Sequence, residues 1–165
     1  MRRQLCALVL GLAFAASAMA LDKGAPAPLF ELAGHEAAAP VKLAGYLGKF
    51  VYVDFWASWC GPCRQSFPWM NELQAKYGAQ GLQIIGVNLD AKKEDAAVFL
   101  KTTPAQFVLA FDSAGATPRN YGVKAMPTSF LIGPDGKILF EHRGFNQAER
   151  AELEGKIKAA LGAQK

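Results

Sequence analysis

The chain has 165 residues, of which 52% are hydrophobic and 19% charged, and its formal net charge at pH 7 is +4. This length suits one ordinary domain with a hydrophobic core and is too short for two. Binding to nucleic acid or to an anionic membrane surface would call for clustered basic residues. The lysine pair at residues 92–93 is followed at once by Glu94 and Asp95, so the sequence predicts neither kind of partner.

Residues 1–20 have the composition of a secretory signal peptide. Two arginines stand near its start, an uncharged apolar stretch of roughly 16 residues follows, and residues 18–20 read Ala-Met-Ala, the small-x-small pattern that precedes cleavage. Because a membrane span usually needs about 20 apolar residues, a cleaved leader is favoured over an uncleaved anchor. We therefore expect a periplasmic protein with a single domain over residues 21–165, and Cys6 is expected to leave with the leader.

After the leader, strand-like and helix-like stretches alternate. Residues 50–56 are strand formers interrupted by Asp54, and a continuous apolar run of that length is typical of a strand covered on both faces. From residue 60 the apolar positions recur at helical spacing, with a bend expected at Pro68. In chain order the predicted elements are strands 29–32, 41–43 and 50–56, helix 60–77, strand 82–89, helix 92–101 capped by Asp90, strand 107–111, helix 117–121, strands 128–132 and 137–142, and a last helix capped by Asn146.

This order of elements predicts an α/β fold. Strands that alternate with helices pair in parallel, whereas two strands joined by the turn at residues 133–136 form an antiparallel hairpin at one edge. We therefore expect a central mixed sheet flanked by helices.

Cys60 and Cys63 are the most informative residues of the chain. Two residues apart at the start of a predicted helix, they can close a disulfide and reopen it by exchange. A bridge across so short a loop removes little unfolded-chain entropy, so a structural role fits poorly. Because a helix N-terminus lowers a thiol pKa, we predict Cys60 as the attacking thiolate and Cys63 as the resolving thiol, with Gly61 and Pro62 restricting the turn between them.

Asp54 is a carboxylate inside an apolar strand, where burial is costly unless the group is protonated or paired. One interpretation is a residue at the strand end turned to water. The favoured interpretation is a functional acid whose pKa is raised by desolvation, which takes the proton from Cys63.

Residues 53–63, Val-Asp-Phe-Trp-Ala-Ser-Trp-Cys-Gly-Pro-Cys, resemble the active-site strand and helix start of thioredoxins. Pro68 matches their helix-kinking proline, and residues 126–128, Met-Pro-Thr, resemble their cis-proline segment. The resemblance covers nearly the whole mature chain and implies a thioredoxin fold. It also implies that Pro127 is cis and faces the disulfide, and that the backbone of Met126 pairs with a substrate strand.

Further features are similar to the exported thiol reductases of the TlpA and ResA type, near the AhpC/TSA grouping. They are the leader, an N-terminal hairpin over residues 27–43 and a helix-strand insertion from about residue 91 to 116. The similarity implies reduction of disulfides in exported proteins, including apocytochrome c, with recharging by a membrane thiol electron donor and without a cofactor. It implies that Trp59, Gly61 and Pro62 contact the substrate.

Two departures leave the proton route open. Thioredoxins pair the buried acid with a lysine on the adjacent strand, and the matching residue here is Gly86. Some ResA proteins place a glutamate after that strand, where this chain has Asp90 followed by Ala91. The proton carrier is therefore Asp54 or Asp90.

Other functions of the cysteine pair are weighed against disulfide exchange. Cys60 and Cys63 can serve as soft ligands in a metal-binding or copper-handling module, but His35 and His142 lack metal-ligand spacing to them and are interpreted as surface or edge residues. A thiol peroxidase would need threonine or serine three positions before the first cysteine, where this chain has Ala57. We expect no metal site.

Overall fold

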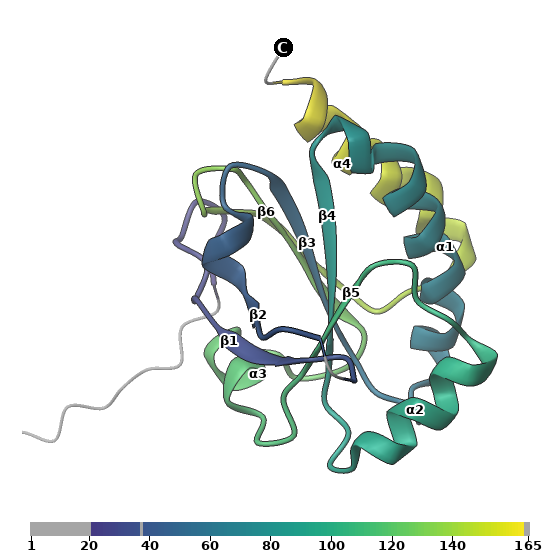
Figure 1. Cartoon of the computed structure of the whole chain (residues 1–165). Helices are drawn as coiled ribbons and strands as arrows, with labels where there is room; N and C mark the ends of the chain where they lie inside the picture. Colours follow the sequence, from purple (N-terminus) through teal and green to yellow (C-terminus); the bar gives the residue numbers. More distant parts are fainter. Residues whose placement is uncertain (1–20, 37, 164–165) are drawn as a thin grey trace, which may run out of the picture.

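A seven-stranded sheet runs through the part of the chain that the computed structural model describes, residues 21–36 and 38–163 (Figure 1). Its strands are β1 (Glu31–Gly34), β2 (Val41–Lys42), β3 (Phe50–Trp56), β4 (Leu82–Asn88), β5 (Val108–Phe111), β6 (Thr128–Ile132) and β7 (Ile138–Arg143). The order across the sheet is β2-β1-β5-β4-β3-β6-β7. Strands β3, β4 and β5 are parallel, whereas the other pairings are antiparallel. The predicted α/β fold with a mixed sheet is confirmed.

Helices cover both faces of this sheet. They are α1 (Gly61–Tyr77), α2 (Lys93–Thr102), α3 (Ala116–Asn120) and α4 (Arg150–Gly162), with 3-10 turns η1 (Leu43–Tyr46), η2 (Gly78–Gln80) and η3 (Gln147–Glu149). Helices α1, α2 and α4 lie on one face, and α3 and η1 lie on the other (Figure 1). Each face therefore has its own apolar layer.

Strand β3 runs through the core and leads into the loop before Cys60. All seven of its residues are buried, which agrees with the continuous apolar run in the sequence. Side chains alternate between the faces of a strand, so Tyr52 and Trp56 pack in the layer beneath α1 and α2, whereas Val53 and Phe55 pack in the opposite layer. Asp54 lies between Tyr52 and Trp56 in this alternation and therefore faces α1.

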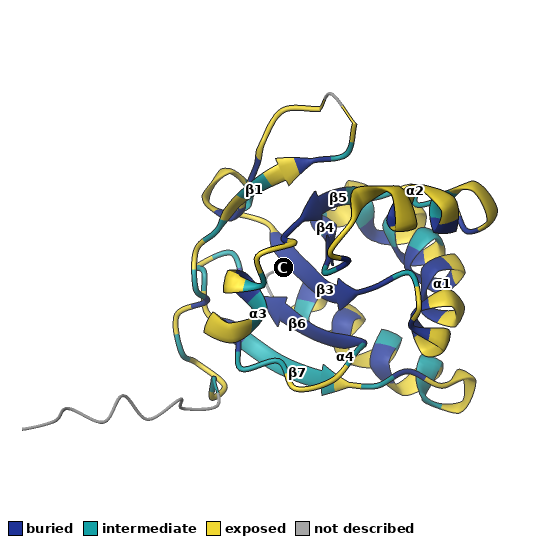
Figure 2. Ribbon diagram, turned by 90° about the horizontal axis from the view of Figure 1, so that it is seen from below, coloured by how far each residue is buried: buried dark blue, intermediate teal, exposed yellow. Residues whose placement is uncertain are grey.

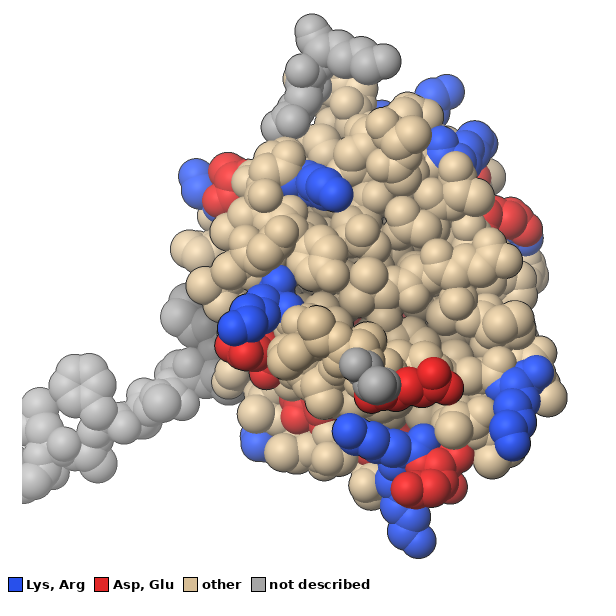
Figure 3. Space-filling view, in the orientation of Figure 1, with Lys and Arg blue, Asp and Glu red and all other residues tan. Residues whose placement is uncertain are grey.

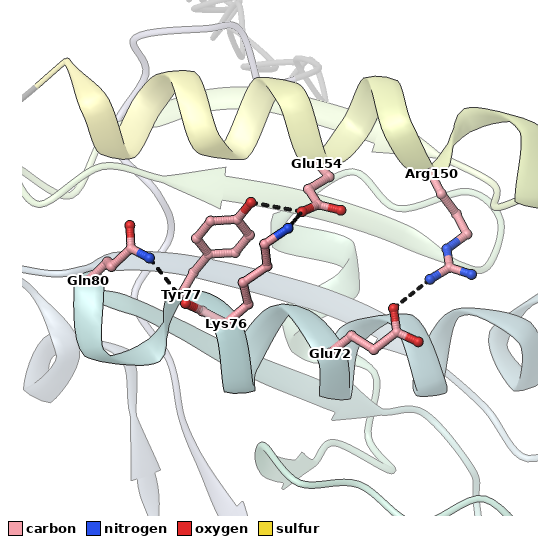
Figure 4. Close-up of polar contacts among 6 residues, drawn as sticks. All are labelled: Glu72, Lys76, Tyr77, Gln80, Arg150 and Glu154. Atoms are coloured by element: carbon pink, nitrogen blue, oxygen red, sulfur yellow. Dashed lines mark hydrogen bonds and ion pairs between the residues drawn. The ribbon is translucent and has the colours of Figure 1, made fainter.

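Polar contacts join α1 to α4 away from the cysteines (Figure 4). The Tyr77 hydroxyl donates to Glu154 Oε1 at 2.7 Å, and Lys76 Nζ contacts the same carboxylate. Arg150 pairs with Glu72 at 2.7 Å. Exposed ion pairs contribute only about 0–1 kcal/mol each, so the apolar layer beneath them supplies most of the stability that holds α1 and α4 together.

All the predicted elements form, and most boundaries agree within one residue. Two starts differ. Asn146 caps the 3-10 turn η3 by accepting from the Glu149 N–H, so the predicted cap is present but α4 itself begins only at Arg150. The strand predicted at residues 29–32 is β1 and begins two residues later. The preceding backbone is already paired elsewhere, because Pro26 forms a bridge with Lys137 and the Ala27 N–H donates to Gly136 O at 2.9 Å. This long-range pairing delays the start of β1.

The surface shown in Figure 3 carries charges of both signs, with Lys and Arg side chains interspersed among Asp and Glu. Among the described residues, none of the helices combines the length and the apolar character that a membrane crossing requires. The predicted signal peptide, residues 1–20, lies outside the described residues.

Candidate active site

Cys60 and Cys63 form a disulfide at the start of α1. Their Cα atoms are 5.3 Å apart. Cys60 is the N-cap residue, and the backbone N–H of Cys63 donates to Cys60 Sγ at 3.2 Å. Cys60 is 5% exposed and Cys63 is fully buried, so Cys60 is the member of the pair that an incoming group can reach. The N–H donor and the positive end of the helix dipole both favour negative charge on its sulfur.

Gly61 and Pro62 make up the first turn of α1 between the two cysteines, and both are exposed. Proline costs little there because the first N–H groups of a helix have no partner within the helix. Trp59, immediately before the pair, is 72% exposed. The residues predicted to contact substrate beside the disulfide therefore lie on the accessible surface.

Asp54 is 1% exposed and faces the layer that contains Cys60 and Cys63, which rules out the interpretation that it turns to water. Its register partners are Gly86 in β4 and Ser129 in β6. Burial raises the pKa of Asp54 to about 7, and the hydrogen bond from Ser129 opposes part of that rise. A carboxyl group with this pKa can accept or release a proton near neutral pH.

Ser129 is a contact of the site that the sequence did not reveal. Its hydroxyl donates to Asp54 Oδ1 at 2.7 Å. Asp54 Oδ2 has no hydrogen-bond partner among the described residues, so one oxygen of the carboxyl is held and the other is available. The sequence signal is weak, since a serine two residues after Pro127 becomes informative only once the β3–β6 register is known.

The structure also explains why no lysine accompanies Asp54. A Cβ atom on Gly86 would lie 3.0 Å from a ring carbon of Phe107, 3.1 Å from Trp56 Nε1 and 3.2 Å from Leu109 Cδ2. These distances are tighter than ordinary van der Waals contact, so the space beside the acid is already filled. Ser129 is thus the hydrogen-bond partner of Asp54 on the adjacent strands.

The prediction that Asp90 caps α2 is wrong. The N-cap residue of α2 is Lys92, and no side chain caps that end. The carboxylate of Asp90, 4% exposed, instead accepts from the Ser58 N–H at 3.0 and 3.2 Å, from Ser58 Oγ at 3.0 Å and from Asn88 Nδ2 at 2.8 Å. Asp90 therefore ties the loop before the disulfide to the end of β4.

One part of the expected geometry is present in the segment before β6. The Met126–Pro127 peptide bond is cis. Pro127 is buried, and its carbonyl accepts from the Gly144 N–H at 2.8 Å. Met126 is partly buried and packs against the apolar layer that includes both cysteines.

The other chemistry-bearing side chains do not gather at this site. His142 lies on the edge strand β7, and His35 follows β1 at the far side of the sheet. Within residues 21–36 and 38–163, no group of three or more His, Cys, Asp or Glu side chains is placed to hold a metal ion.

Comparison with known proteins agrees with this geometry. The model of the Redoxin family matches residues 22–157. The chain belongs to the Redoxin family. The thiol-disulfide oxidoreductase ResA of Bacillus thuringiensis subsp. konkukian (strain 97-27) is 40% identical over 134 residues, which cover 80% of this chain and 76% of the relative. ResA of Geobacillus thermodenitrificans (strain NG80-2) is 36% identical over 119 residues, covering 72% of this chain and 68% of the relative.

A solved structure gives the same assignment. The crystal structure described as the thiol:disulfide interchange protein DsbE of Chlorobium tepidum is 60% identical, with a TM-score of 0.83, and the match covers 86% of this chain and 99% of that one. These relatives and the Cys60–Cys63 pair identify this Redoxin family member as a thiol-disulfide oxidoreductase with a thioredoxin-like fold. The predicted family and enzyme class are confirmed.

Proposed function

We propose that this oxidoreductase is exported and reduces disulfides in other exported proteins. The observation that carries the proposal is the arrangement at the start of α1, where Cys60 Sγ accepts the Cys63 N–H and Asp54 lies buried on the same face. The leader pattern of residues 1–20 supports export. Gly61 and Pro62 between the cysteines resemble the reducing thioredoxin type rather than the oxidising DsbA type.

The reaction begins with the reduced dithiol. The Cys60 thiolate attacks one sulfur of a substrate disulfide, forms a mixed disulfide and displaces the other substrate sulfur as a thiolate, which takes up a proton from solvent. Cys63 then loses its proton and attacks Cys60 Sγ. This step forms the Cys60–Cys63 disulfide and releases the second substrate thiol, so two electrons have passed from enzyme to substrate.

Asp54 accepts the proton of Cys63 in the second step. Its pKa of about 7 suits transfer in both directions near neutral pH, because a general base works best when its pKa is close to the working pH. Asp54 Oδ2 has no hydrogen-bond partner among the described residues, whereas three donors bind the two carboxylate oxygens of Asp90. The hydrogen bonding therefore favours Asp54 over Asp90 as the proton carrier.

Pro127 and Met126 would align the substrate beside the disulfide, with the Met126 backbone pairing with an extended substrate segment. Substrates include apocytochrome c, whose cysteines must be reduced before haem attachment. The oxidised enzyme has to be recharged by a membrane protein that carries a dithiol, which becomes a disulfide as Cys60 and Cys63 regain two electrons.

Trapping tests this assignment. In the Cys63→Ser variant, a peptide with the Cys-x-x-Cys-His haem-attachment motif in its disulfide form should remain bound to Cys60 as a reducible adduct. The Cys60→Ser variant, which keeps the buried thiol, is the matched control and should trap none. Equal trapping by both variants would contradict the assigned roles.

The direction of electron flow is tested separately by equilibrating the wild type with glutathione redox buffers. We expect a potential near the thioredoxin value of about −270 mV. A value near that of DsbA, about −120 mV, would contradict a role as reductant.

A further inference from the structure

An open groove of about 460 Å³ lies between the loop that leads into the disulfide and α2. Trp59 and Val98 line it, and Phe99 lies at its base. Figure 2, which looks at the end of the sheet where β3 leads into α1, shows α2 beside the start of α1 with an exposed outer surface. The groove is therefore continuous with the reactive end of the molecule.

The apolar side chains of this groove are unusually exposed. Trp59 is 72% exposed and Val98 is 65% exposed. Among the described residues, the other exposed large hydrophobic side chains are Leu29 and Leu47, both less exposed than Trp59 and Val98, and neither of them lines the groove. A single exposed apolar residue is ordinary, but two in one groove next to a reactive sulfur indicate a binding surface.

The wall that Trp59 forms is held in place. The backbone N–H and the hydroxyl of the neighbouring Ser58 both donate hydrogen bonds to the buried carboxylate of Asp90. A buried carboxylate with these bonds fixes the backbone of the loop, so the exposed indole projects from a rigid base. A preformed surface loses less conformational entropy when a partner binds.

The opposite wall is fixed in a similar way. The Arg64 guanidinium lies 4.7 Å from the centre of the Phe99 ring, and Nη1 donates to the hydroxyls of Thr102 and Thr103 at 3.3 and 3.2 Å. These contacts join the first turn of α1 to the end of α2. Asp95 also lines the groove. Because its charge is opposite to that of Arg64, the groove does not favour substrates of either charge.

We propose that the groove between Trp59 and Val98 binds an apolar side chain of the substrate protein, carried by an extended segment next to the cysteine that reacts with Cys60. This proposal depends on the proposed function in one respect, namely that the substrate is a polypeptide. The mixed disulfide tethers that cysteine beside Trp59. In an extended chain, residues two positions apart lie on the same side and about 7 Å from each other, so a side chain at that spacing reaches the groove.

Matched peptides test the proposal. Each peptide has nine residues with one cysteine and is supplied as the symmetric disulfide dimer, and the peptides differ only in carrying Leu or Ser two positions before or after the cysteine. Stopped-flow tryptophan fluorescence of the reduced enzyme gives the second-order rate constant for each. We expect the wild type to reduce the better Leu peptide about tenfold faster than its Ser counterpart, which corresponds to ~1.4 kcal/mol.

Two variants on the same helix separate the groove from general effects of charge. Val98→Glu places a carboxylate in the groove and should reduce the Leu-to-Ser ratio to less than twofold. Ala97→Glu adds the same charge at the adjacent exposed position, which does not line the groove, and should keep the tenfold ratio. Because each ratio is taken within one enzyme, a change in overall rate cancels.

A ratio below twofold in the wild type, or a tenfold ratio that persists in Val98→Glu, would overturn the groove proposal. Hydroxyethyl disulfide has no side chain that could bind in the groove. Its reduction by the wild type therefore tests disulfide exchange at Cys60 separately from the groove. Failure to reduce this compound would count against the proposed reductase function and, with it, the groove. Normal reduction of it without a Leu preference would count against the groove alone.

Discussion

Replacing Asp54 with Asn should change how the stability of the oxidised protein depends on pH. Burial raises the pKa of Asp54 from 3.8 to about 7, so the folded state holds this proton more firmly than the unfolded chain does. The folded protein is therefore progressively destabilised as pH rises through the interval from about 4 to about 7, and the loss levels off above it. The amide of the Asp54→Asn variant does not titrate, so the variant should lack this slope.

The size of the effect follows from the two pKa values. A difference of roughly three pKa units corresponds to about 4 kcal/mol between pH 4 and pH 9. Urea unfolding of wild type and Asp54→Asn at both pH values measures it, with the disulfide intact in each sample. Between pH 4 and pH 9, the free energy of unfolding of the variant should rise by about 4 kcal/mol relative to that of the wild type.

This comparison is insensitive to packing changes caused by the substitution, because such changes shift the variant by a similar amount at every pH. Parallel pH dependences of the two proteins, within about 1 kcal/mol, would refute the reasoning. That result would mean that the Asp54 carboxyl is hydrated or paired in the folded protein.

Three further substitutions test neighbouring contacts. Ser129→Ala removes the hydrogen bond that lowers the pKa of Asp54, so the pKa of this acid should rise. In stopped-flow assays, the rate at which Cys63 releases the substrate should then reach half of its maximum at a higher pH, and Ser129→Thr should restore the original midpoint. Asp90→Ala leaves the half-buried Ser58 donors and the buried Asn88 amide unpaired and should lower the free energy of unfolding in urea by about 2–4 kcal/mol, with a smaller loss for Asp90→Asn. Gly86→Ala forces a Cβ against three side chains and should cost about 1–3 kcal/mol, measured as a lower Tm, and an unchanged Tm would contradict the tight packing.

The sequence predicted the parts of the site that depend on local patterns. The strand at residues 50–56 and the helix start at Cys60 follow from a continuous apolar run and a change to helical spacing within a short window. The position of Asp54 inside that run was enough to identify it as an unusual acid. These features need no knowledge of how distant segments pair.

The contacts that the sequence missed or misplaced are mainly long-range. Ser129 meets Asp54 through the register of β3 with β6, across 75 positions of the chain. Asp90 was predicted to cap the helix that follows it, but it binds Ser58, 32 positions earlier. Local spacing favours a cap at this aspartate, whereas the tertiary structure provides a better set of donors nearby.

The unequal accessibility of the two sulfurs constrains the order of events in turnover. Cys63 is fully buried, so electrons enter and leave the enzyme through Cys60 alone. Under the proposed function, the protein that supplies electrons and the protein that receives them would each occupy the same small area around this one atom, and they cannot occupy it together. The proposed function therefore implies a ping-pong cycle in which the enzyme shuttles between two partners that compete for one surface.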